Sequence, residues 1–186
     1  NNIFRCYAAS QENQYPNVYK ARKYNHELIL KYLKKENGYF HTYELIKKSI
    51  IKNISKNINK VRIHSSGDFF SGEYLRSWLT VARSMPQLKF YCYSKSLHLF
   101  GTNVRIPDNF FLTASMGGKM DILIHKKYFK RWAIVVNSED EAIKKGIEHI
   151  GKPYEIDKDD SHCFKPDPFA LLIHGTQKKG YFKNLK

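Results

Sequence analysis

The segment spanning residues 61–71 constrains the fold more than any other part of this sequence. A short apolar run ends there in small and ionisable residues, and a stretch with helical spacing follows. Such a pattern predicts a buried strand followed by a helix, and open α/β sheets and barrels carry their functional groups at the carboxyl ends of such strands. The residues placed at this edge are His64, Ser65, Ser66 and Asp68.

The same pattern recurs three times downstream. Polar residues follow apolar runs at Ser94-Lys95, at Ser115–Lys119 and at His174. Strand–helix–strand spacing of this kind favours parallel pairing with right-handed crossovers. We therefore expect one α/β domain over residues 1–186 with a mainly parallel sheet, built as a partial (β/α) barrel or as an open twisted sheet flanked by helices. The expected strands are Lys60–Ile63, Leu88–Tyr93, Phe110–Ala114, Trp132–Asn137 and Phe169–Ile173.

Helices are expected between these strands and before the first of them. One runs from Asn17 to a left-handed cap at Glu36-Asn37-Gly38. A second runs from His41 to Ser55. Ser71 and Ser138 each look like the N-cap of a further helix, and the helix after Ser138 is expected to end at Gly146. The first helix carries an apolar stripe of Val18, Ala21, Tyr24, Leu28 and Tyr32. The side chains expected to face inward on the second are Tyr43, Ile46, Ile50, Ile51 and Ile54.

The charge balance points to a polyanionic partner. The chain holds 32 Lys and Arg against 17 Asp and Glu, a net charge of +15, with a pI near 9.6. Nucleic acid is the first candidate for such a partner. The alternative is that the codon bias of an AT-rich genome spreads lysine evenly over the surface. The total charge alone does not distinguish a basic binding surface from this alternative.

Cysteine usage and hydropathy indicate a location in the interior of a cell, the cytoplasm. Cys6, Cys92 and Cys163 are odd in number and far apart, which argues against a disulfide framework. No run approaches the roughly 20 apolar residues that cross a bilayer, so no membrane partner is expected. A start at Asn1 rather than at methionine suggests a piece of a longer reading frame.

Several of the strand-end residues are of the types that ligate divalent metals or act as general acids and bases. If they meet in space, metal-assisted hydrolysis of a phosphodiester is the expected chemistry. The alternative is structural: Asp68 caps the helix after it, Asp159-Asp160 stabilises a turn, and the histidines belong to the core. The predicted catalytic residues are His64, Asp68, Asp160, His162 and His174, and the predicted metal ligands are Cys6, Asp68, Asp159 and His162.

A second group is predicted to bind phosphate. Ser115-Met-Gly-Gly-Lys119 follows a strand and precedes a helical stretch, so its backbone amides could cradle an anion. The alternative is a tight turn in which glycine supplies a positive φ. Tyr91 and Tyr93 are candidates for stacking on bases, or for the core. The whole predicted phosphate-binding set is Ser65, Ser66, Gly67, Lys95, Ser115, Gly117, Gly118 and Lys119.

Ordered motifs along nearly the whole chain resemble the phage "gene product 88" family. They are Phe4–Ser10 with Tyr15–Val18, Val61–Ser71, Tyr91–Leu97, Leu112–Ser115 with Gly117-Gly118, Asp159–His162 and Phe169–Gly175. The resemblance implies an origin in a phage or mobile element. It implies no particular activity. It also implies that members commonly have a further cysteine-containing segment before the Cys-Tyr-Ala motif.

The order of the cysteine motif, strand and Gly-acidic turn is also similar to that of radical S-adenosylmethionine enzymes. In that comparison Cys6 would help to hold an iron–sulfur cluster, and Gly67-Asp68 would receive the amino group of S-adenosylmethionine. One cysteine does not hold such a cluster, which takes several thiolates. Cys6 as a small buried apolar residue is the alternative.

Three hypotheses follow for the function. The first is an α/β protein whose strand-end site binds phosphate or a nucleotide and acts on or near nucleic acid, with a divalent metal as cofactor. The second is a non-catalytic basic module that binds nucleic acid or a phage-encoded protein. The third is an iron–sulfur enzyme similar to the radical S-adenosylmethionine class.

Overall fold

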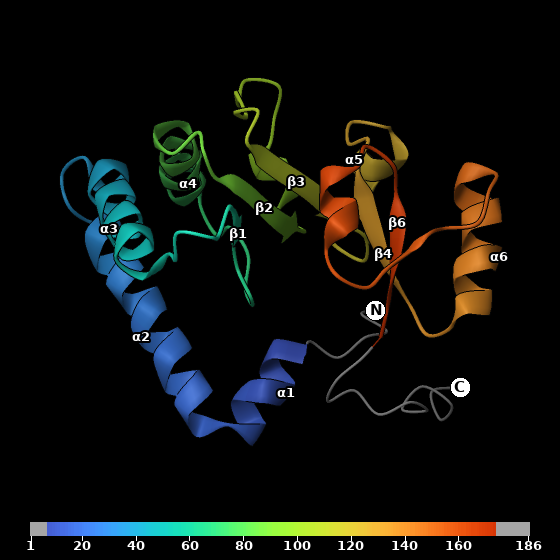
Figure 1. The fold of residues 1–186 in the computed structure, drawn as a ribbon, viewed down its shortest axis with the longest axis horizontal. Helices are drawn as coiled ribbons and strands as arrows, with labels where there is room; N and C mark the ends of the chain where they lie inside the picture. Colours follow the sequence, from blue (N-terminus) through green and yellow to red (C-terminus); the bar gives the residue numbers. More distant parts are fainter. Residues whose placement is uncertain (1–6, 174–186) are drawn as a thin grey trace. The chain divides into compact units, whose positions relative to one another are not determined.

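The computed structural model describes residues 7–173, in which three helices come first and strands separated by helices follow (Figure 1). The helices are α1 (Tyr7–Gln14), α2 (Pro16–Leu33), α3 (Gly38–Asn53), α4 (Gly72–Ser84), α5 (Ile122–His125) and α6 (Glu139–Ile150), with 3-10 helices η1 (Leu97–Leu99) and η2 (Ser161–Phe164). The strands are β1 (Lys60–Arg62), β2 (Lys89–Ser94), β3 (Phe110–Ser115), β4 (Trp132–Val136), β5 (Ile156–Asp157) and β6 (Phe169–Leu172).

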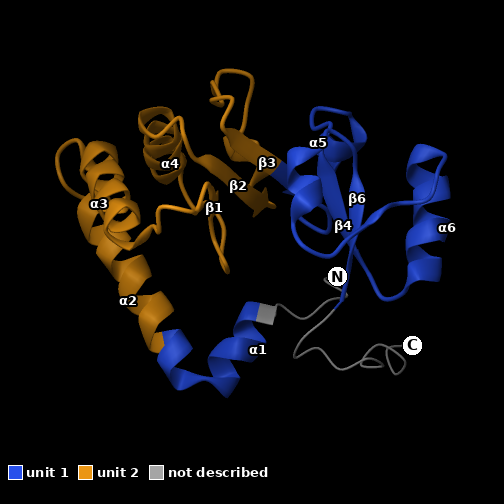
Figure 2. Ribbon diagram, viewed as in Figure 1, with its two compact units in different colours: residues 1–19, 113–186 blue, residues 20–112 orange. Residues whose placement is uncertain are grey.

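The strands of this described part follow the order β1-β2-β3-β4-β6-β5. The pairs β1–β2, β3–β4, β4–β6 and β5–β6 are all parallel. The predicted α/β class with a mainly parallel sheet is therefore confirmed. Backbone contacts divide the chain into two compact units, with the boundaries inside α2 and inside β3 (Figure 2). We call residues 1–19 with 113–186 unit 1 and residues 20–112 unit 2, and the prediction of one domain stays a prediction.

Unit 2 is built around the paired strands β1 and β2 and the helix α4. Val61 pairs with Phe90, and the Phe90 side chain is completely buried. Helix α4 begins where the sequence predicts, because the Ser71 hydroxyl accepts a 3.2 Å hydrogen bond from the Tyr74 amide. The buried Ser77 hydroxyl donates to the carbonyl of Tyr39 at the start of α3 and so ties the two helices together.

The apolar stripes expected on the first two helices are confirmed only in part. Helix α2 has no buried residue, and Tyr24 on its expected apolar stripe is 64% exposed. On α3, Tyr43 and Ile46 are buried as expected, but Ile51 is 57% exposed. The apolar residues of α3 cover more of its circumference than α4 can bury, so the pattern overstated the core. The expected cap of the first helix at residues 36–38 is wrong, because α2 ends at Leu33. Asn37 does adopt the left-handed conformation, with φ of 53°, but as the residue that precedes α3.

Unit 1 is built on β4, which pairs with β3 on one side and β6 on the other. Ala133 is the partner of both Ser115 and Phe169 in these two ladders. Ser138 caps α6 as expected, by accepting a hydrogen bond from the amide of Glu141. The buried Val136, Phe169 and Ala170 form part of the core of this unit.

The expected end of α6 at Gly146 is wrong. The helix continues to Ile150 and ends at Gly151, which has φ of 73°. Gly146 is buried inside the helix, and a Cβ there would overlap the backbone nitrogen of Tyr154. Glycine is therefore needed at this position for close packing of two backbones rather than for termination.

Helix α1 and strand β5 have no counterpart in the elements expected from the sequence. Strand β5 is only two residues long, too short to leave a periodic pattern. Among residues 7–173 no helix combines the length and the apolar character needed to cross a membrane.

Candidate functional site

The loop after β1 and the end of β2 meet in unit 2 at the carboxylate of Asp68. Its Oδ1 accepts hydrogen bonds of 2.7 Å from the amide of Phe69 and from the hydroxyl of Ser94. Its Oδ2 accepts from the amides of Lys95 at 2.7 Å and Ser96 at 3.1 Å. Four donors therefore engage this predicted catalytic and metal-binding residue, and its clearest role is to hold two neighbouring strand ends in register.

The predicted phosphate ligands of unit 2 lie on the two segments that this carboxylate joins, the loop after β1 and the end of β2. Ser65, Gly67 and Lys95 are exposed and Ser66 is half-buried. Gly67 has φ of 81°, the left-handed conformation that glycine adopts at little cost. The two strand ends thus present hydroxyls, backbone and a lysine side chain at one rim, which we call the β1–β2 rim.

His64 lies beside this rim in an unusual environment. Its φ of 62° is uncommon for a residue other than glycine. Its Nε2 lies 2.9 Å from the Tyr74 hydroxyl, its ring packs edge-on against Phe69, and its buried Nδ1 has no hydrogen-bond partner in the described part of the chain. Burial lowers the pKa of His64 below the ordinary value of 6.5, while the charge of Asp68 opposes this shift. The imidazole is therefore neutral at neutral pH, a state in which it can accept a proton.

In unit 1, the predicted phosphate loop after β3 already holds an anionic group. The amides of Gly117 and Gly118 donate hydrogen bonds of 2.8 and 2.9 Å to the two carboxylate oxygens of Asp121. Gly117 has φ of 93°, as the tight-turn alternative expected. Ser115 is half-buried and Lys119 is exposed. The loop has the geometry of an anion nest, and the anion that it binds belongs to its own chain.

The connection from β5 to β6 forms the second polar cluster of unit 1. The Nδ1 of His162 lies 3.1 Å from Oδ1 of Asp157, and its Nε2 lies 2.7 Å from Oε2 of Glu155. Lys165 also contacts Glu155 at 3.2 Å. The hydrogen bonds from His162 and Lys165 lower the pKa of Glu155. His162 is thus fixed between two carboxylates, and the fully buried one is Asp157.

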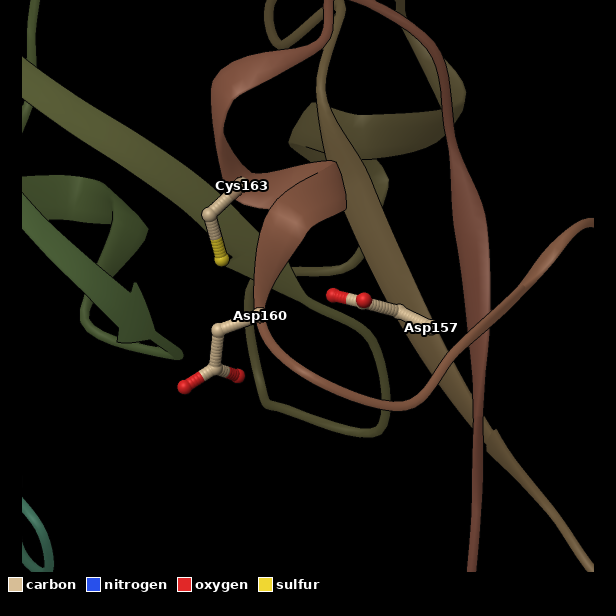
Figure 3. A group of neighbouring side chains, drawn as sticks. All are labelled: Asp157, Asp160 and Cys163. Atoms are coloured by element: carbon tan, nitrogen blue, oxygen red, sulfur yellow. The ribbon is translucent and has the colours of Figure 1, made fainter.

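Three possible metal-ligating side chains meet in this connection (Figure 3). Ligand atoms of Asp157, Asp160 and Cys163 all lie within 4.8 Å of one another. The sequence pattern pointed to Asp160 but not to Asp157 or Cys163, since β5 was not recognised and Cys163 was considered only for disulfide bonding. The Asp-x-x-Asp-x-x-Cys spacing was the available signal. The predicted ligand Asp159 is exposed, and its carboxylate accepts a 3.1 Å hydrogen bond from the amide of Ser161.

Other predicted residues fall elsewhere. Cys6 and His174 lie outside the described residues, so their roles as cluster ligand and as catalytic residue stay predictions. Tyr91 and Tyr93 are half-buried, and the guanidinium of Arg62 lies 5.2 Å from the centre of the Tyr93 ring. The expectation that the polar strand-end residues of both units meet in space also stays a prediction.

The positive charge is concentrated in one unit. Residues 20–112 contain 17 Lys and Arg against 6 Asp and Glu, a net charge of +11. The rest of the chain contains 15 against 11, a net charge of +4. Lysine itself is spread evenly, with 12 residues in unit 2 and 13 in the rest of the chain. The higher net charge of unit 2 comes from its fewer acidic residues, 6 against 11, and from its additional arginines, 5 against 2.

Comparison with known proteins identifies the family of the chain. A search of curated proteins found no match, and a search of solved structures found none either. The family model described as gene product 88 matches residues 2–186, which is nearly the entire sequence. The chain therefore belongs to the gene product 88 family of phages.

Proposed function

We propose that the protein binds nucleic acid and that unit 2 makes the main contact with the phosphate backbone. The observation that carries this proposal is the charge of residues 20–112, +11 of the total of +15. Neutralisation of phosphates by Lys and Arg, with release of counterions, supplies most of the affinity of non-specific nucleic-acid binding. Such a partner fits the host-cell interior predicted from the cysteine content.

Helix α2 supports the proposal because it presents cations and aromatic rings together. None of its residues is buried, although it is 18 residues long. Tyr19 is 48% and Tyr24 64% exposed. Lysine side chains bind phosphates, and exposed tyrosines stack on bases without regard to sequence. The exposed lysines of this helix are Lys20, Lys23 and Lys31.

The β1–β2 rim is the proposed phosphate contact at the sheet. Asp68 fixes the backbone of Lys95 by a 2.7 Å hydrogen bond, and the exposed Lys95 side chain extends from that anchored position. Ser65 and Ser66 add hydroxyl donors on the loop after β1. A cation held on a rigid strand end binds an anion with less loss of freedom than one on a mobile loop.

Fluorescence anisotropy with labelled single-stranded and duplex DNA and RNA, repeated at several salt concentrations, tests this proposal. The variant K20Q/K23Q/K31Q should bind more weakly, and its log–log salt dependence should flatten by up to about 0.9 for each duplex phosphate that the variant no longer neutralises. The matched control K126Q/K130Q/K144Q removes the same charge from exposed positions of unit 1 and should bind almost as the wild type does. Equal weakening by both variants, or no binding by the wild type, would contradict the proposal.

Phosphodiester hydrolysis at the β1–β2 rim is a second candidate, favoured by one observation. His64 is kept neutral by burial, which is the protonation state that a general base needs, and its buried Nδ1 has no partner within the described residues, so a substrate would have to bring the reacting proton to this nitrogen. Incubation of labelled DNA and RNA with the protein and Mg²⁺, Mn²⁺ or Zn²⁺ tests for turnover. H64N should abolish any cleavage while nucleic-acid binding persists; binding without cleavage under every condition would leave the non-catalytic module as the function.

A further inference from the structure

The buried carboxylate of Asp157 has one oxygen without a hydrogen-bond partner. Its side chain is 0% exposed, and its Oδ1 faces His162 at 3.1 Å and the amide of Asp159 at 3.4 Å. Its Oδ2 is buried and makes no hydrogen bond to any described residue. A buried carboxylate oxygen left in this state costs substantial free energy, and a bound ion or water molecule would satisfy it.

The segment after β5 brings two further donors to the same place. Asp160 adopts φ of 62°, and this left-handed residue turns the chain into the 3-10 helix η2, which carries Cys163. The Cys163 residue is completely buried. Figure 3 shows the side chains of Asp157 and Cys163 directed toward one another from the strand and from η2.

We propose that Asp157, Asp160 and Cys163 bind a divalent transition-metal ion of the zinc class. Zinc coordinates carboxylate oxygen and thiolate sulfur at about 2.0–2.3 Å, so its tetrahedral ligand atoms lie about 3.3–3.8 Å apart. The three ligand atoms here lie within 4.8 Å of one another, so metal binding requires them to move closer together. The thiol proton passes to solvent when the metal binds.

The donor set decides between classes of metal. Mg²⁺ and Ca²⁺ take oxygen ligands only, whereas a thiolate beside carboxylates suits Zn²⁺, Co²⁺ or Fe²⁺. Three protein ligands leave a fourth tetrahedral position for water or a substrate atom. The set differs from the one that the sequence suggested, because His162 contacts Asp157 in place of the metal.

His162 is the positioning residue of this site. Ligating carboxylates are commonly oriented by a second hydrogen-bonded group, and replacement of such a group lowers metal affinity about 10–100-fold. Here the imidazole holds Oδ1 of Asp157, and Oδ2 has no hydrogen-bond partner among the described residues. Glu155 in turn holds the other ring nitrogen at 2.7 Å.

Titration of the chelator-treated full chain with Co²⁺ tests the site. One Co²⁺ per chain should bind, with a thiolate-to-cobalt charge-transfer absorption in the near ultraviolet and intense tetrahedral ligand-field bands in the visible. Zn²⁺ should displace it, and Mg²⁺ should not. The charge-transfer absorption should disappear in C163S and persist in C92S, a matched control because Cys92 is also completely buried.

Asp160→Asn keeps the test decisive if C163S does not fold. Asparagine tolerates the left-handed conformation of this position, so the backbone is preserved while a charged ligand is removed. D160N should bind Co²⁺ at least about tenfold more weakly, and H162Q about 10–100-fold more weakly. Absence of Co²⁺ binding, absorption that persists in C163S, or wild-type affinity of D160N would overturn the proposal. The site is independent of the nucleic-acid binding proposed for unit 2, so either can fail alone.

Discussion

The hydroxyl of Ser94 donates a 2.7 Å hydrogen bond to the carboxylate of Asp68 and so joins the end of β2 to the loop after β1. Ser94 is almost completely buried, with 1% of its surface exposed. The same carboxylate accepts from the amides of Phe69, Lys95 and Ser96. One side chain therefore sets the relative position of two neighbouring strand ends, at which the β1–β2 rim is formed.

Asp68→Ala is expected to destabilise the protein by about 2–4 kcal/mol, because hydrogen bonds to charged groups contribute about 1.5–3 kcal/mol each and several are removed together. Urea-induced unfolding followed by circular dichroism measures the change. Asp108→Ala, which removes an exposed carboxylate from the same unit, should change the unfolding free energy by less than about 0.5 kcal/mol. Equal effects of the two substitutions would show that the Asp68 hydrogen bonds do not hold the rim.

The strands were predictable because their apolar runs are continuous and end sharply. The second strand was expected at Leu88–Tyr93 and is found at Lys89–Ser94. The caps Ser71 and Ser138 were predictable for a similar reason, since an N-cap depends on residues within the next turn of the chain. Local patterns of this kind carry enough information to give the fold class.

The candidate site was less predictable because it depends on contacts between residues far apart in the sequence. Asp68 was expected as a cap or a catalytic residue, whereas its partners Ser94 and Lys95 lie 26 and 27 residues away. Asp157 was missed since β5 has only two residues and no pattern of its own. Gly146 was mistaken for a helix end, because its close approach to Tyr154 is a tertiary contact.

Gly146→Ala is expected to destabilise unit 1 by about 1–3 kcal/mol or more, as overpacking against fixed backbone does. The added Cβ would overlap the backbone nitrogen of Tyr154, which a side-chain rotation cannot relieve. This cost should exceed the gain of about 1 kcal/mol that alanine has over glycine inside a helix. Thermal unfolding by calorimetry or circular dichroism measures the outcome.

Gly72→Ala is the matched control for this substitution. Gly72 is the first residue of α4, and a Cβ there would meet no atom within 4 Å. The variant should be neutral or more stable by up to about 1 kcal/mol, since alanine restricts the unfolded chain. A neutral G146A would mean that α6 and the segment after it are not closely packed in solution.

The buried His64 should make unit 2 less stable in mild acid. The unfolded state takes up a proton at His64 near pH 6.5, whereas burial lowers the pKa of this group in the folded state. The unfolded state therefore binds more protons in the window between the two pKa values, and the free energy of unfolding falls as the pH falls through that window. Below the pKa of the folded state the destabilisation from this residue stops increasing.

His64→Asn tests this origin, because asparagine tolerates the left-handed backbone at this position. Urea unfolding between about pH 7.5 and pH 5 should show a smaller decrease of stability for H64N than for the wild type. His98→Asn, at an exposed position of the same unit, should keep the wild-type slope. If H64N and H98N both follow the wild type, the pH dependence comes from other groups.

The loop after β3 offers a test of the predicted phosphate cradle, because Asp121 already fills it. The Asp121 carboxylate accepts hydrogen bonds from the amides of Gly117 and Gly118. A tethered carboxylate competes at a high effective concentration, so phosphate in solution should not displace it from the wild type. Asp121→Ala exposes both amides beside Lys119, and phosphate should then bind there weakly.

Nuclear magnetic resonance titration with inorganic phosphate measures this directly. The amide resonances of Gly117 and Gly118 should shift in D121A at millimolar phosphate and stay nearly constant in the wild type. Asp140→Ala is the control, since it removes an exposed carboxylate of the same unit at the start of α6. If D121A folds but its glycine amides do not respond, the nest is shaped for the carboxylate of its own chain, and phosphate recognition has to come from the β1–β2 rim instead.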